Sequence, residues 1–485
     1  MKKNYFKWTV NAIPVLFAAG SAPAADRPNV LVIMADDMRY DQMTHAGHPY
    51  VQTPNLDRLA AEGVRFTHAY ASTPLCGPCR MSIFSGQLPP VHGRVDNFYY
   101  PEDYDVYLPE SFKQQGYRTA MIGKWYEGST FKKKTRGSVY DFWFEMGEPD
   151  LSKFTGQPRT PEYAKFRDEH MYYDQEYDVN GKTTVIKGHM TDILFDAAGG
   201  FAAEKSQKPF MTFMTTFAPH GPFNPTLERK GKYTGKGIPP RENNLFGKNY
   251  MTPARTKQMT EVHERTCEMI EDIDDGIGRI FETLEKSGEL DNTIIVFTSD
   301  NGVMFGEHAF GWKRHPWQES VRVPLIIRYP KAIAKGTVSD AAVTLVDLFP
   351  TLAELAGVKL PNDPFRYGKS LVPLMNGTAK SIRDATLFLQ YEKGIQGKYD
   401  FAPEEMEWVA LTRDDGWKLV RYRVGPPADM RAPADFPKTM LFNLNDDPYE
   451  MNNLAGAPEH QSLIEKMKEQ ISVEMKKNKG QVNWL

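Results

Sequence analysis

The sequence has little cysteine, almost no net charge and no long hydrophobic run, and each of these absences excludes a class of protein. Cysteine occurs only at positions 76, 79 and 267 of the 485 residues, which is too few for a disulfide-built scaffold. The 62 acidic and 59 basic residues leave a formal net charge of −3, which excludes a protein that coats nucleic acid with a basic surface. Hydrophobic residues make up 41% of the chain, as in an ordinary globular protein with a substantial core.

The N-terminal segment is the place where a membrane span would first be sought. Its apolar stretch, residues 8–19, is shorter than the roughly 20 residues that a spanning helix needs. Three lysines precede this stretch and small residues follow it at 22–24, which is the pattern of a secretory signal peptide. We therefore expect residues 1–25 to be a cleaved signal peptide, the mature chain to have no membrane span, and the protein to be secreted or periplasmic.

Several apolar runs of strand length are followed by turns and then by segments with helical spacing, which indicates an α/β fold. The runs are apolar on both faces, so we expect buried, mostly parallel strands in a central sheet that is flanked by helices. They span residues 29–34, 117–122, 209–217, 293–298 and 323–328.

Helical periodicity separates the predicted strands. The pattern predicts a helix that begins after Thr53, which is a suitable N-cap residue, and ends near residue 63. A longer amphipathic helix is predicted over residues 260–286. Another is predicted over residues 339–356, where Pro350 should begin, kink or divide part of it.

The composition changes between residues 361 and 369, where proline, aspartate and glycine become frequent. We place a domain boundary there, with a large α/β domain over residues 26–365 and a smaller α+β domain over residues 366–485. The smaller domain is predicted to hold an antiparallel sheet and a closing helix. Its strands are expected at residues 407–411, 417–422 and 440–444, and its helix at 462–476.

Polar side chains with oxygen ligands follow two of the predicted strands. Asp36 and Asp37 come after the first apolar run, and Asp300 and Asn301 lie just past the run over residues 293–298. Ligands of open α/β sheets bind at the carboxyl ends of the strands, where both pairs would meet. Three carboxylates and one amide oxygen form a hard, all-oxygen site suited to Ca²⁺ or Mg²⁺. One Asp-Asp pair alone would more simply be a helix cap or a solvated turn, but two pairs favour the metal site.

Residues 76–80 read Cys-Gly-Pro-Cys-Arg, and the Cys-x-x-Cys spacing has several interpretations. Redox pairs at helix N-termini use this spacing. A zinc site would need a second ligand pair, and Cys267 is the only other cysteine. Haem attachment requires histidine after the second cysteine, where this chain has Arg80. Judged by its spacing, a thiol oxidoreductase that uses Cys76 and Cys79 stays open.

The residues after this motif extend it. Residues 76–86 read CGPCRMSIFSG, which resembles the sulfatase signature Cys-x-Pro-x-Arg followed by a short helix that ends in Ser/Thr-Gly. In that family the first cysteine is converted after translation to formylglycine, whose hydrated aldehyde is the nucleophile. The resemblance implies that a formylglycine-generating maturation enzyme modifies Cys76, and it implies an alkaline-phosphatase-like fold. The fourth signature position is commonly serine, and here it is Cys79.

The resemblance covers most of the chain, because further motifs of the family follow in order and at suitable spacing. They are residues 29–37 (opening strand and metal-binding aspartates), 53–59 (the next helix), 123–125 (lysine motif), 218–222 (histidine motif), 299–302 (second metal pair), Lys313 ahead of 319–324, and 441–454 (C-terminal ending).

The resemblance implies a metal centre and a nucleophile that belong together. Asp36, Asp37, Asp300 and Asn301, with the modified Cys76, would bind Ca²⁺, with Mg²⁺ as the alternative ion. The metal would hold one oxygen of the hydrated formylglycine and sharpen it as a nucleophile.

The resemblance also implies catalytic and substrate-binding roles for four basic residues. Lys124 and Lys313 would neutralise the oxygens of the sulfate ester. Arg80, one helical turn after Cys76, would hold the hydrated aldehyde and the metal ligands with its planar fork. His220 would bind the substrate and protonate the leaving alcohol.

One position departs from the family pattern. The lysine motif usually continues with histidine two residues after the lysine, and here Tyr126 stands there. Tyrosine, with an ordinary pKa near 10, is a poor proton shuttle at neutral pH. His308 and His315, which lie close to Lys313 in the sequence, are candidates to replace the family histidine at position 126. A surface or core role is the simpler interpretation of both.

The sequence therefore predicts a sulfuric ester hydrolase that removes sulfate from a sulfated poly- or oligosaccharide. The nearest alternative is a phosphonate or phosphate ester hydrolase on the same scaffold, since such enzymes share the metal ligands and the nucleophile. A further alternative is a carbohydrate-binding protein with a degraded active site, which the tyrosine at position 126 suggests.

Overall fold

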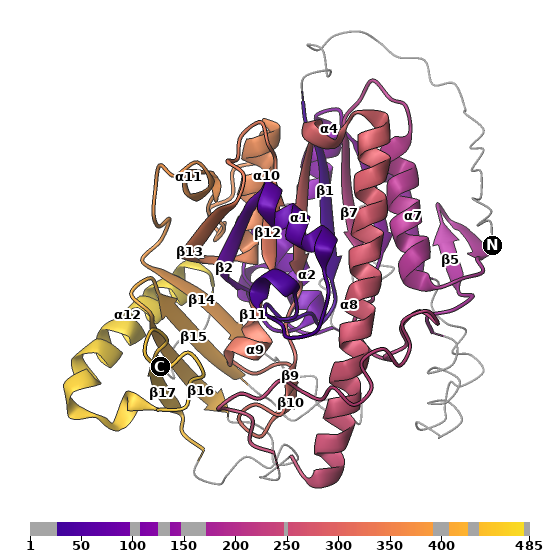
Figure 1. Ribbon diagram of the computed structural model, residues 1–485. Helices are drawn as coiled ribbons and strands as arrows, with labels where there is room; N and C mark the ends of the chain where they lie inside the picture. The colour runs from indigo at the N-terminus through magenta and orange to yellow at the C-terminus, as the bar shows by residue number, and fades with distance from the viewer. Residues whose placement is uncertain are drawn as a thin grey trace, which may run out of the picture.

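The computed structural model describes residues 27–97, 107–124, 136–146, 171–246, 251–390, 407–424 and 436–479 (Figure 1). The predicted signal peptide over residues 1–25 and Tyr126 lie outside the described residues. Among the residues that are described, no helix is both long and apolar enough to cross a membrane.

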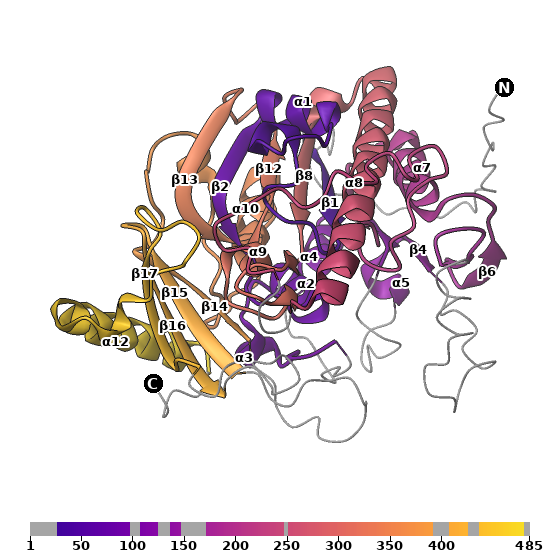
Figure 2. The same ribbon diagram turned by 60° about the horizontal axis from the view of Figure 1, so that its bottom comes forward.

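A large sheet forms the centre of the molecule (Figures 1 and 2). Its strands are β1 (Asn29–Ala35), β2 (Val64–Tyr70), β3 (Arg118–Gly123), β4 (Phe142–Met146), β5 (Glu176–Val179), β6 (Lys182–Val185), β7 (Phe210–Thr215), β8 (Thr293–Ser299), β11 (Arg322–Val323), β12 (Leu325–Arg328) and β13 (Thr337–Thr344). Their order is β11-β2-β12-β8-β1-β7-β3-β4-β5-β6, with β13 paired to β2. The consecutive strands β8, β1, β7, β3 and β4 are parallel, so the sheet is mostly parallel at its centre, as predicted.

Four of the five predicted apolar runs form the parallel strands β1, β3, β7 and β8. The fifth run, residues 323–328, is buried but antiparallel, because β12 pairs antiparallel with both β8 and β2. The prediction of parallel direction was wrong there. An apolar pattern on both faces indicates burial, whereas strand direction depends on how the chain returns to the sheet.

Helices cover both faces of the sheet (Figures 1 and 2). Residues of β1 alternate between the faces, with Val32 in the core under one helical layer and Ile33 in the core under the other. One layer holds α1 (Pro54–Glu62), α7 (Met190–Ala203) and α8 (Pro253–Ser287), and the other holds α2 (Cys76–Ser85), α4 (Leu108–Gln114) and α10 (Leu348–Ala356). Shorter helices are α3 (Pro89–His92), α5 (Arg136–Val139), α9 (Gln318–Val321) and α11 (Val372–Met375).

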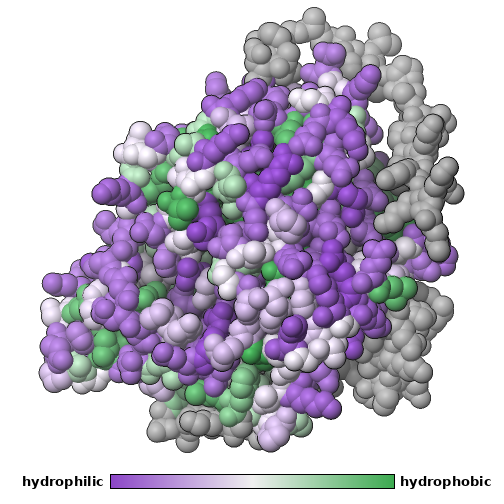
Figure 3. Space-filling view, in the orientation of Figure 1, coloured by the Kyte–Doolittle hydropathy of each residue, from purple (hydrophilic) through white to green (hydrophobic). Residues whose placement is uncertain are grey.

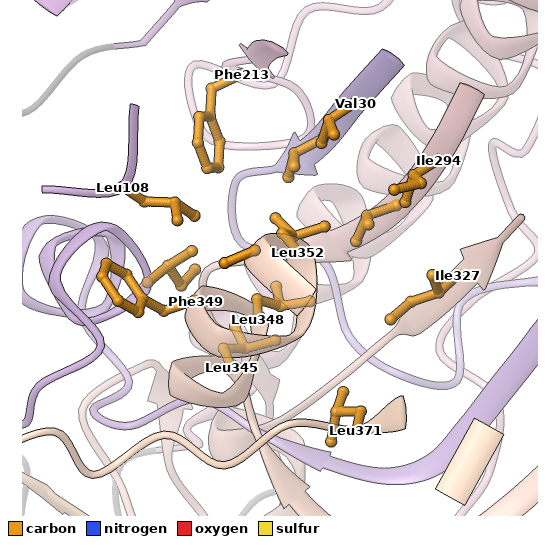
Figure 4. Close-up of a cluster of buried hydrophobic side chains, with 14 of the residues drawn as sticks. Val30, Leu108, Phe213, Ile294, Ile327, Leu345, Leu348, Phe349, Leu352 and Leu371 are labelled. Atoms are coloured by element: carbon orange, nitrogen blue, oxygen red, sulfur yellow. The ribbon is translucent and has the colours of Figure 1, made fainter. Parts of the chain in front are cut away.

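The core on the α10 side of the sheet is shown in Figure 4. Leu348 and Leu352 of α10 lie among Val30 of β1 and Ile294 of β8, and all four side chains are fully buried. Full burial of a side chain of this size contributes about 1.5–3 kcal/mol. This layer therefore anchors α10 to the centre of the sheet, and α2 packs within the same core.

The helix predicted over residues 339–356 is correct only in its second part. Residues up to 344 belong to β13, which pairs parallel with β2, and a 3₁₀ turn (Leu345–Asp347) leads into α10. Pro350 is the third residue of α10, where the backbone N–H has no helical partner to lose. The edge of β2 that faces away from β11 and β12 provides hydrogen-bond partners for residues of β13, and this tertiary pairing overrides their local helical pattern.

Helix α1 begins where predicted, but the hydroxyl of Thr53 does not cap it. Thr53 Oγ1 instead lies 3.2 Å from Thr44 Oγ1. The carboxylate of Asp274 on α8 accepts hydrogen bonds from the N–H groups of Asn55 and Leu56, at 3.1 and 2.8 Å. A distant helix therefore supplies the cap.

A second, antiparallel sheet follows in the C-terminal part of the chain. It consists of β14 (Ala385–Gln390), β15 (Glu407–Arg413), β16 (Trp417–Val424) and β17 (Thr439–Asn443), and α12 (Gln461–Lys477) packs against it. The three predicted strands and the predicted helix are confirmed, whereas β14 was not predicted. The boundary near residue 365 stays a prediction.

The two faces of this small sheet meet different parts of the molecule (Figure 2). Leucines such as Leu411 and Leu419 on one face pack on Met467 of α12. The opposite face carries aromatic side chains, among them Trp408, which cluster with Trp317 of the large domain. The small sheet is therefore sandwiched between α12 and the large domain.

Two short strands, β9 (Met304–Phe305) and β10 (Gly311–Trp312), form a separate antiparallel pair close to the carboxyl end of β8. The molecular face shown in Figure 3 is mostly hydrophilic, with hydrophobic side chains in small groups. The described residues on that face form no broad apolar patch of the kind that marks a large interface.

Candidate active site

The carboxyl ends of β1 and β8 bring the predicted oxygen ligands together. The two strands are parallel neighbours with Ala35 opposite Ser299, so Asp36 and Asp300 leave the same edge of the sheet. The backbone turns at Asp37, which has a φ of 69°. Adjacent residues of a regular strand point to opposite faces, and the turn at Asp37 removes that constraint.

Helix α2 directs its first residue toward these carboxylates. Cys76 Sγ lies 3.3 Å from Oδ1 of Asp36. Ligand atoms of Cys76, Asp36, Asp37 and Asp300 all lie within 4.8 Å of one another. The structure thus assembles the predicted nucleophile position and three predicted metal ligands in one place.

Arg80 lies one helical turn after Cys76 and points to the same cluster. Its Nε and Nη2 lie 2.8 and 2.7 Å from Oδ2 of Asp300, and its Nη1 donates to the backbone oxygen of Lys124 at 3.0 Å. The side chains of Arg80 and Asp300 are 2% and 0% exposed, so water does not compete for these contacts. A planar guanidinium makes such contacts in two directions, which a lysine ammonium does not reproduce.

Two lysines from distant segments approach the sulfur of Cys76. Lys124 follows β3, forms an ion pair with Asp36, and places Nζ 3.9 Å from Cys76 Sγ. Lys313 follows β10, with Nζ 2.9 Å from the same sulfur and 2.5 Å from Oδ1 of Asp37. Two positive charges therefore lie beside the position from which a nucleophile would act.

His220 follows β7 and reaches the cluster from a third side. Its Nε2 lies 3.7 Å from Oδ2 of Asp37, and its Nδ1 lies 2.7 Å from the backbone oxygen of Gly221. The carbonyl requires a proton on Nδ1, which directs Nε2 toward the site. The side chain keeps 32% exposure, so an incoming molecule can reach it. Partial burial and the charge of Lys124 lower the pKa of His220.

Tyr172 is a supporting residue that the sequence did not indicate. Its hydroxyl donates to the backbone oxygen of His220 at 2.6 Å, and its ring is fully buried. No motif surrounds it, because a single tyrosine that binds a distant backbone oxygen leaves no pattern in the sequence.

Burial and nearby charges shift the pKa values of the neighbouring carboxylates in opposite directions. Burial alone would raise the pKa of Asp36, but the charges of Lys124 and the other nearby cations outweigh it and hold that pKa far below its usual range. Burial and the charge of Asp36 raise the pKa of Asp300. Carboxylates this close repel one another, so the cluster favours a bound cation.

The donor set fits a divalent metal ion. Oδ1 of Asn301 is buried and makes no hydrogen bond, while its Nδ2 donates to Oδ1 of Asp37 at 2.6 Å. An unpartnered buried amide oxygen beside three carboxylates is a hard oxygen donor set, which Ca²⁺ and Mg²⁺ prefer. Asp36, Asp37, Asp300 and Asn301 are therefore suited to hold such an ion.

The cysteines do not have the properties of a redox pair. Cys76, Cys79 and Cys267 are free and fully buried. Burial and the charge of Asp36 raise the pKa of the Cys76 thiol, and burial and Asp300 raise that of Cys79 to about 12. Reactive thiols have a lowered pKa and are accessible, so the geometry argues against a thiol oxidoreductase.

Of the two histidines considered as substitutes for the family histidine at position 126, His315 lies in the core and His308 is half-buried. His315 is buried with its ring stacked on Phe310, at 4.6 Å between the ring centres. His308 stacks on Trp317 at 3.9 Å. His315 is thus held by ring stacking, and His308 also places Nε2 3.3 Å from Nδ2 of Asn243.

A model of the family described as Sulfatase matches residues 28–358, which include every residue of this cluster. The chain belongs to the sulfatase family. It is therefore a sulfuric ester hydrolase. A second family model, described as N-sulphoglucosamine sulphohydrolase, C-terminal, matches residues 306–477.

This sulfatase is similar over most of its length to proteins that act on sulfated sugars. It is 30% identical to an N-acetylglucosamine-6-O-sulfatase of Bacteroides thetaiotaomicron, over 90% of this chain and 84% of the relative. It is 29% identical to the N-acetylgalactosamine-6-sulfatase of Rattus norvegicus, over 75% and 69% of the two chains. A structure solved in complex with its substrate D-glucosamine-2-N,6-O-disulfate superposes with a TM-score of 0.76 at 28% identity, covering 93% of this chain and 98% of the other.

Proposed function

We propose that this sulfatase removes sulfate from a sulfated carbohydrate, with 6-O-sulfated amino sugars as the first substrates to test. The observation that carries the proposal is the cluster around Cys76, in which three carboxylates and two lysines converge on one sulfur. The names of the similar proteins supply the sugar class.

We further propose that Cys76 is converted to formylglycine by a maturation enzyme. The side chain of Cys76 is 0% exposed in the folded protein. A modifying enzyme would therefore have to act before the chain folds. The hydrated aldehyde would supply an oxygen nucleophile where the unmodified chain has a poorly acidic thiol.

A calcium ion, or magnesium in its place, would be held by Asp36, Asp37, Asp300 and Asn301 together with residue 76. Such an ion supplies positive charge beside the nucleophile and the ester oxygens. Arg80 keeps Asp300 oriented through its two contacts, and it ties this carboxylate to the segment of Lys124.

The basic side chains account for the rest of the chemistry. A sulfate ester carries negative charge, and Lys124 and Lys313 would neutralise it beside the nucleophile, where preorganised charges stabilise a transition state most. His220 presents Nε2 to the site and would donate a proton to the departing sugar oxygen. Tyr172 would keep the backbone of His220 in place.

We also propose where the protein acts and how its chain divides into domains. We expect the signal peptide over residues 1–25 to direct the protein to the periplasm or outside the cell, where sulfated polysaccharides are degraded. We also keep the division into a catalytic domain over residues 26–365 and a C-terminal domain over residues 366–485.

Two measurements test the proposal. The mass of the peptide that contains residue 76 should show formylglycine in active protein, and Cys76→Ala should abolish turnover while the fold persists. Turnover of N-acetylglucosamine-6-sulfate should exceed turnover of an aryl phosphonate. A strong preference for the phosphonate would instead support the alternative ester hydrolase, and full activity of Cys76→Ala would exclude the mechanism.

A further inference from the structure

The loop that carries Lys313 is held from outside by the C-terminal sheet. Residues 313–318 run from Lys313 to helix α9, and alternate backbone groups along this stretch contact side chains of the small domain. The contacts are Trp408 Nε1 to the oxygen of Arg314 at 2.8 Å, Lys418 Nζ to the oxygen of Pro316, and the N–H of Gln318 to Oε2 of Glu450 at 2.9 Å.

Lys418 and Glu450 form an ion pair in the interior of the protein. Their side chains are 0% and 1% exposed. Burial lowers the pKa of Lys418 and raises the pKa of Glu450, which reflects the cost of taking both charges out of water. A buried pair of this kind adds little net stability compared with apolar residues of similar size. The pair instead fixes the backbone of the loop, since Lys418 and Glu450 each also bind one backbone group of it.

Several polar side-chain atoms within the loop form no hydrogen bond. Both ring nitrogens of His315, Nε1 of Trp317 and Nε2 of Gln318 are buried without a hydrogen bond. The residues on either side of Lys313 also have strained backbones, with φ of 69° at Trp312 and 78° at Arg314. Non-glycine residues keep such angles only where their surroundings impose them.

The strained backbone and the external contacts occur at the same place. The indole N–H of Trp408 binds the oxygen of Arg314, which is the residue next to Lys313. Trp408 lies on the aromatic face of the small sheet, where it packs with Trp317. The rigid sheet therefore fixes the backbone immediately after the lysine whose Nζ lies 2.9 Å from Cys76 Sγ.

We propose that Trp408, Lys418 and Glu450 are positioning residues, through which the C-terminal domain holds Lys313 in place for sulfate ester hydrolysis. The proposal rests on the role proposed above for Lys313. It assigns to the small domain a part in catalysis that it exerts without touching the substrate.

The first test removes the contacts of Trp408 and Lys418, and the charge of Glu450, with conservative variants of the full chain. Trp408→Phe deletes one donor and keeps an aromatic ring. The double variant Lys418→Met/Glu450→Gln deletes both charges and the donor to Pro316, and the amide oxygen of the new glutamine still accepts from Gln318. We expect each to lower kcat/KM on the order of tenfold per formylglycine-bearing molecule, since misplacing a catalytic group by about 1 Å costs up to 100-fold. Lys418→Arg, which keeps a donor, should stay within threefold of the unchanged enzyme.

A matched control distinguishes positioning from general destabilisation. Arg383 and Asp347 form another ion pair whose side chains are 5% and 0% exposed, and the carboxylate of Asp347 binds backbone groups of Thr344 and Lys369 instead of the loop. The variant Arg383→Met/Asp347→Asn should lower the urea midpoint about as much as the Lys418/Glu450 variant, yet leave kcat/KM within twofold. Equal activity losses in the two double variants would overturn the proposal.

The second test asks whether the effect passes through Lys313. The Lys418/Glu450 changes are combined with Lys313→Ala and assayed on an aryl sulfate with a good leaving group, so that low rates stay measurable. We expect no further fall in kcat/KM, because residues that act as a unit are not additive. If the Lys418/Glu450 changes lower kcat/KM by the same factor with and without Lys313→Ala, the positioning role is refuted. Full activity of Lys313→Ala alone would refute the proposed role of Lys313 itself, and with it the positioning.

Discussion

Substituting Gly123 by alanine tests whether the end of β3 places Lys124 by a close backbone approach. Gly123 has a φ of 99°, and a Cβ added there would lie 2.0 Å from the backbone oxygen of Thr215 on β7. That oxygen accepts the N–H of Lys124 at 2.7 Å. The added methyl group would therefore push apart two paired strands at the point where Lys124 leaves the sheet.

Two contributions set the expected loss of stability in Gly123→Ala. Positive φ costs a non-glycine residue about 1–2 kcal/mol, and displacing packed backbone costs about 1–3 kcal/mol more. We expect Gly123→Ala to lower the free energy of unfolding by about 2–5 kcal/mol. We also expect kcat/KM to fall at least about tenfold, because Lys124 moves away from Cys76.

Gly116, two residues before the start of the same strand, provides the matched control. Its φ is 91°, but an added Cβ would have no neighbour within 4 Å. Gly116→Ala should therefore lower the free energy of unfolding only by the cost of the positive φ, about 1–2 kcal/mol, and should keep its activity. Urea unfolding measures the loss of stability, and kcat/KM of each purified variant measures the loss of activity. Equal stability losses in the two variants, or an active Gly123→Ala enzyme, would show that the close approach does not position the lysine.

Four further predictions concern the site and its surroundings. His220→Ala should reduce turnover of a sugar sulfate much more than that of nitrophenyl sulfate, whose phenolate leaves without a proton; equal losses would argue against an acid role. Prolonged dialysis against a chelator should lower both activity and the melting temperature, and added Ca²⁺ should restore them, since a ligand of the folded state stabilises it by about 2.7 kcal/mol at 100 times its Kd. Cys79→Ser should keep hydrolytic activity, whereas a redox pair would need both thiols. Burial raises the pKa of Glu145 to about 7, so its ionisation destabilises the fold as pH rises from about 4.5 to 7; Glu145→Gln should raise the urea midpoint at pH 8 and barely change it at pH 4.

The sequence allowed the central strands to be predicted because their burial leaves a local trace. β1, β3, β7 and β8 are short apolar runs bounded by turns, and the amphipathic stripe of α8 extends over many turns. β13 was predicted as a helix because its pairing partner, β2, is distant in the sequence. The direction of β12 and the cap that Asp274 gives α1 were missed for the same reason.

For the candidate site, the sequence by itself determined the chemical kinds of the residues: carboxylates and an amide after two strands, a cysteine at a helix start, and four basic residues in family order. Only the tertiary structure decided which atoms meet. Lys313 reaches the sulfur of Cys76 although 237 positions separate them, and Tyr172 supports His220 without any motif. The physical reason is that composition and periodicity express burial and charge along the chain, whereas hydrogen bonds depend on distances of a few ångströms that exist only after the sheet and its loops have packed.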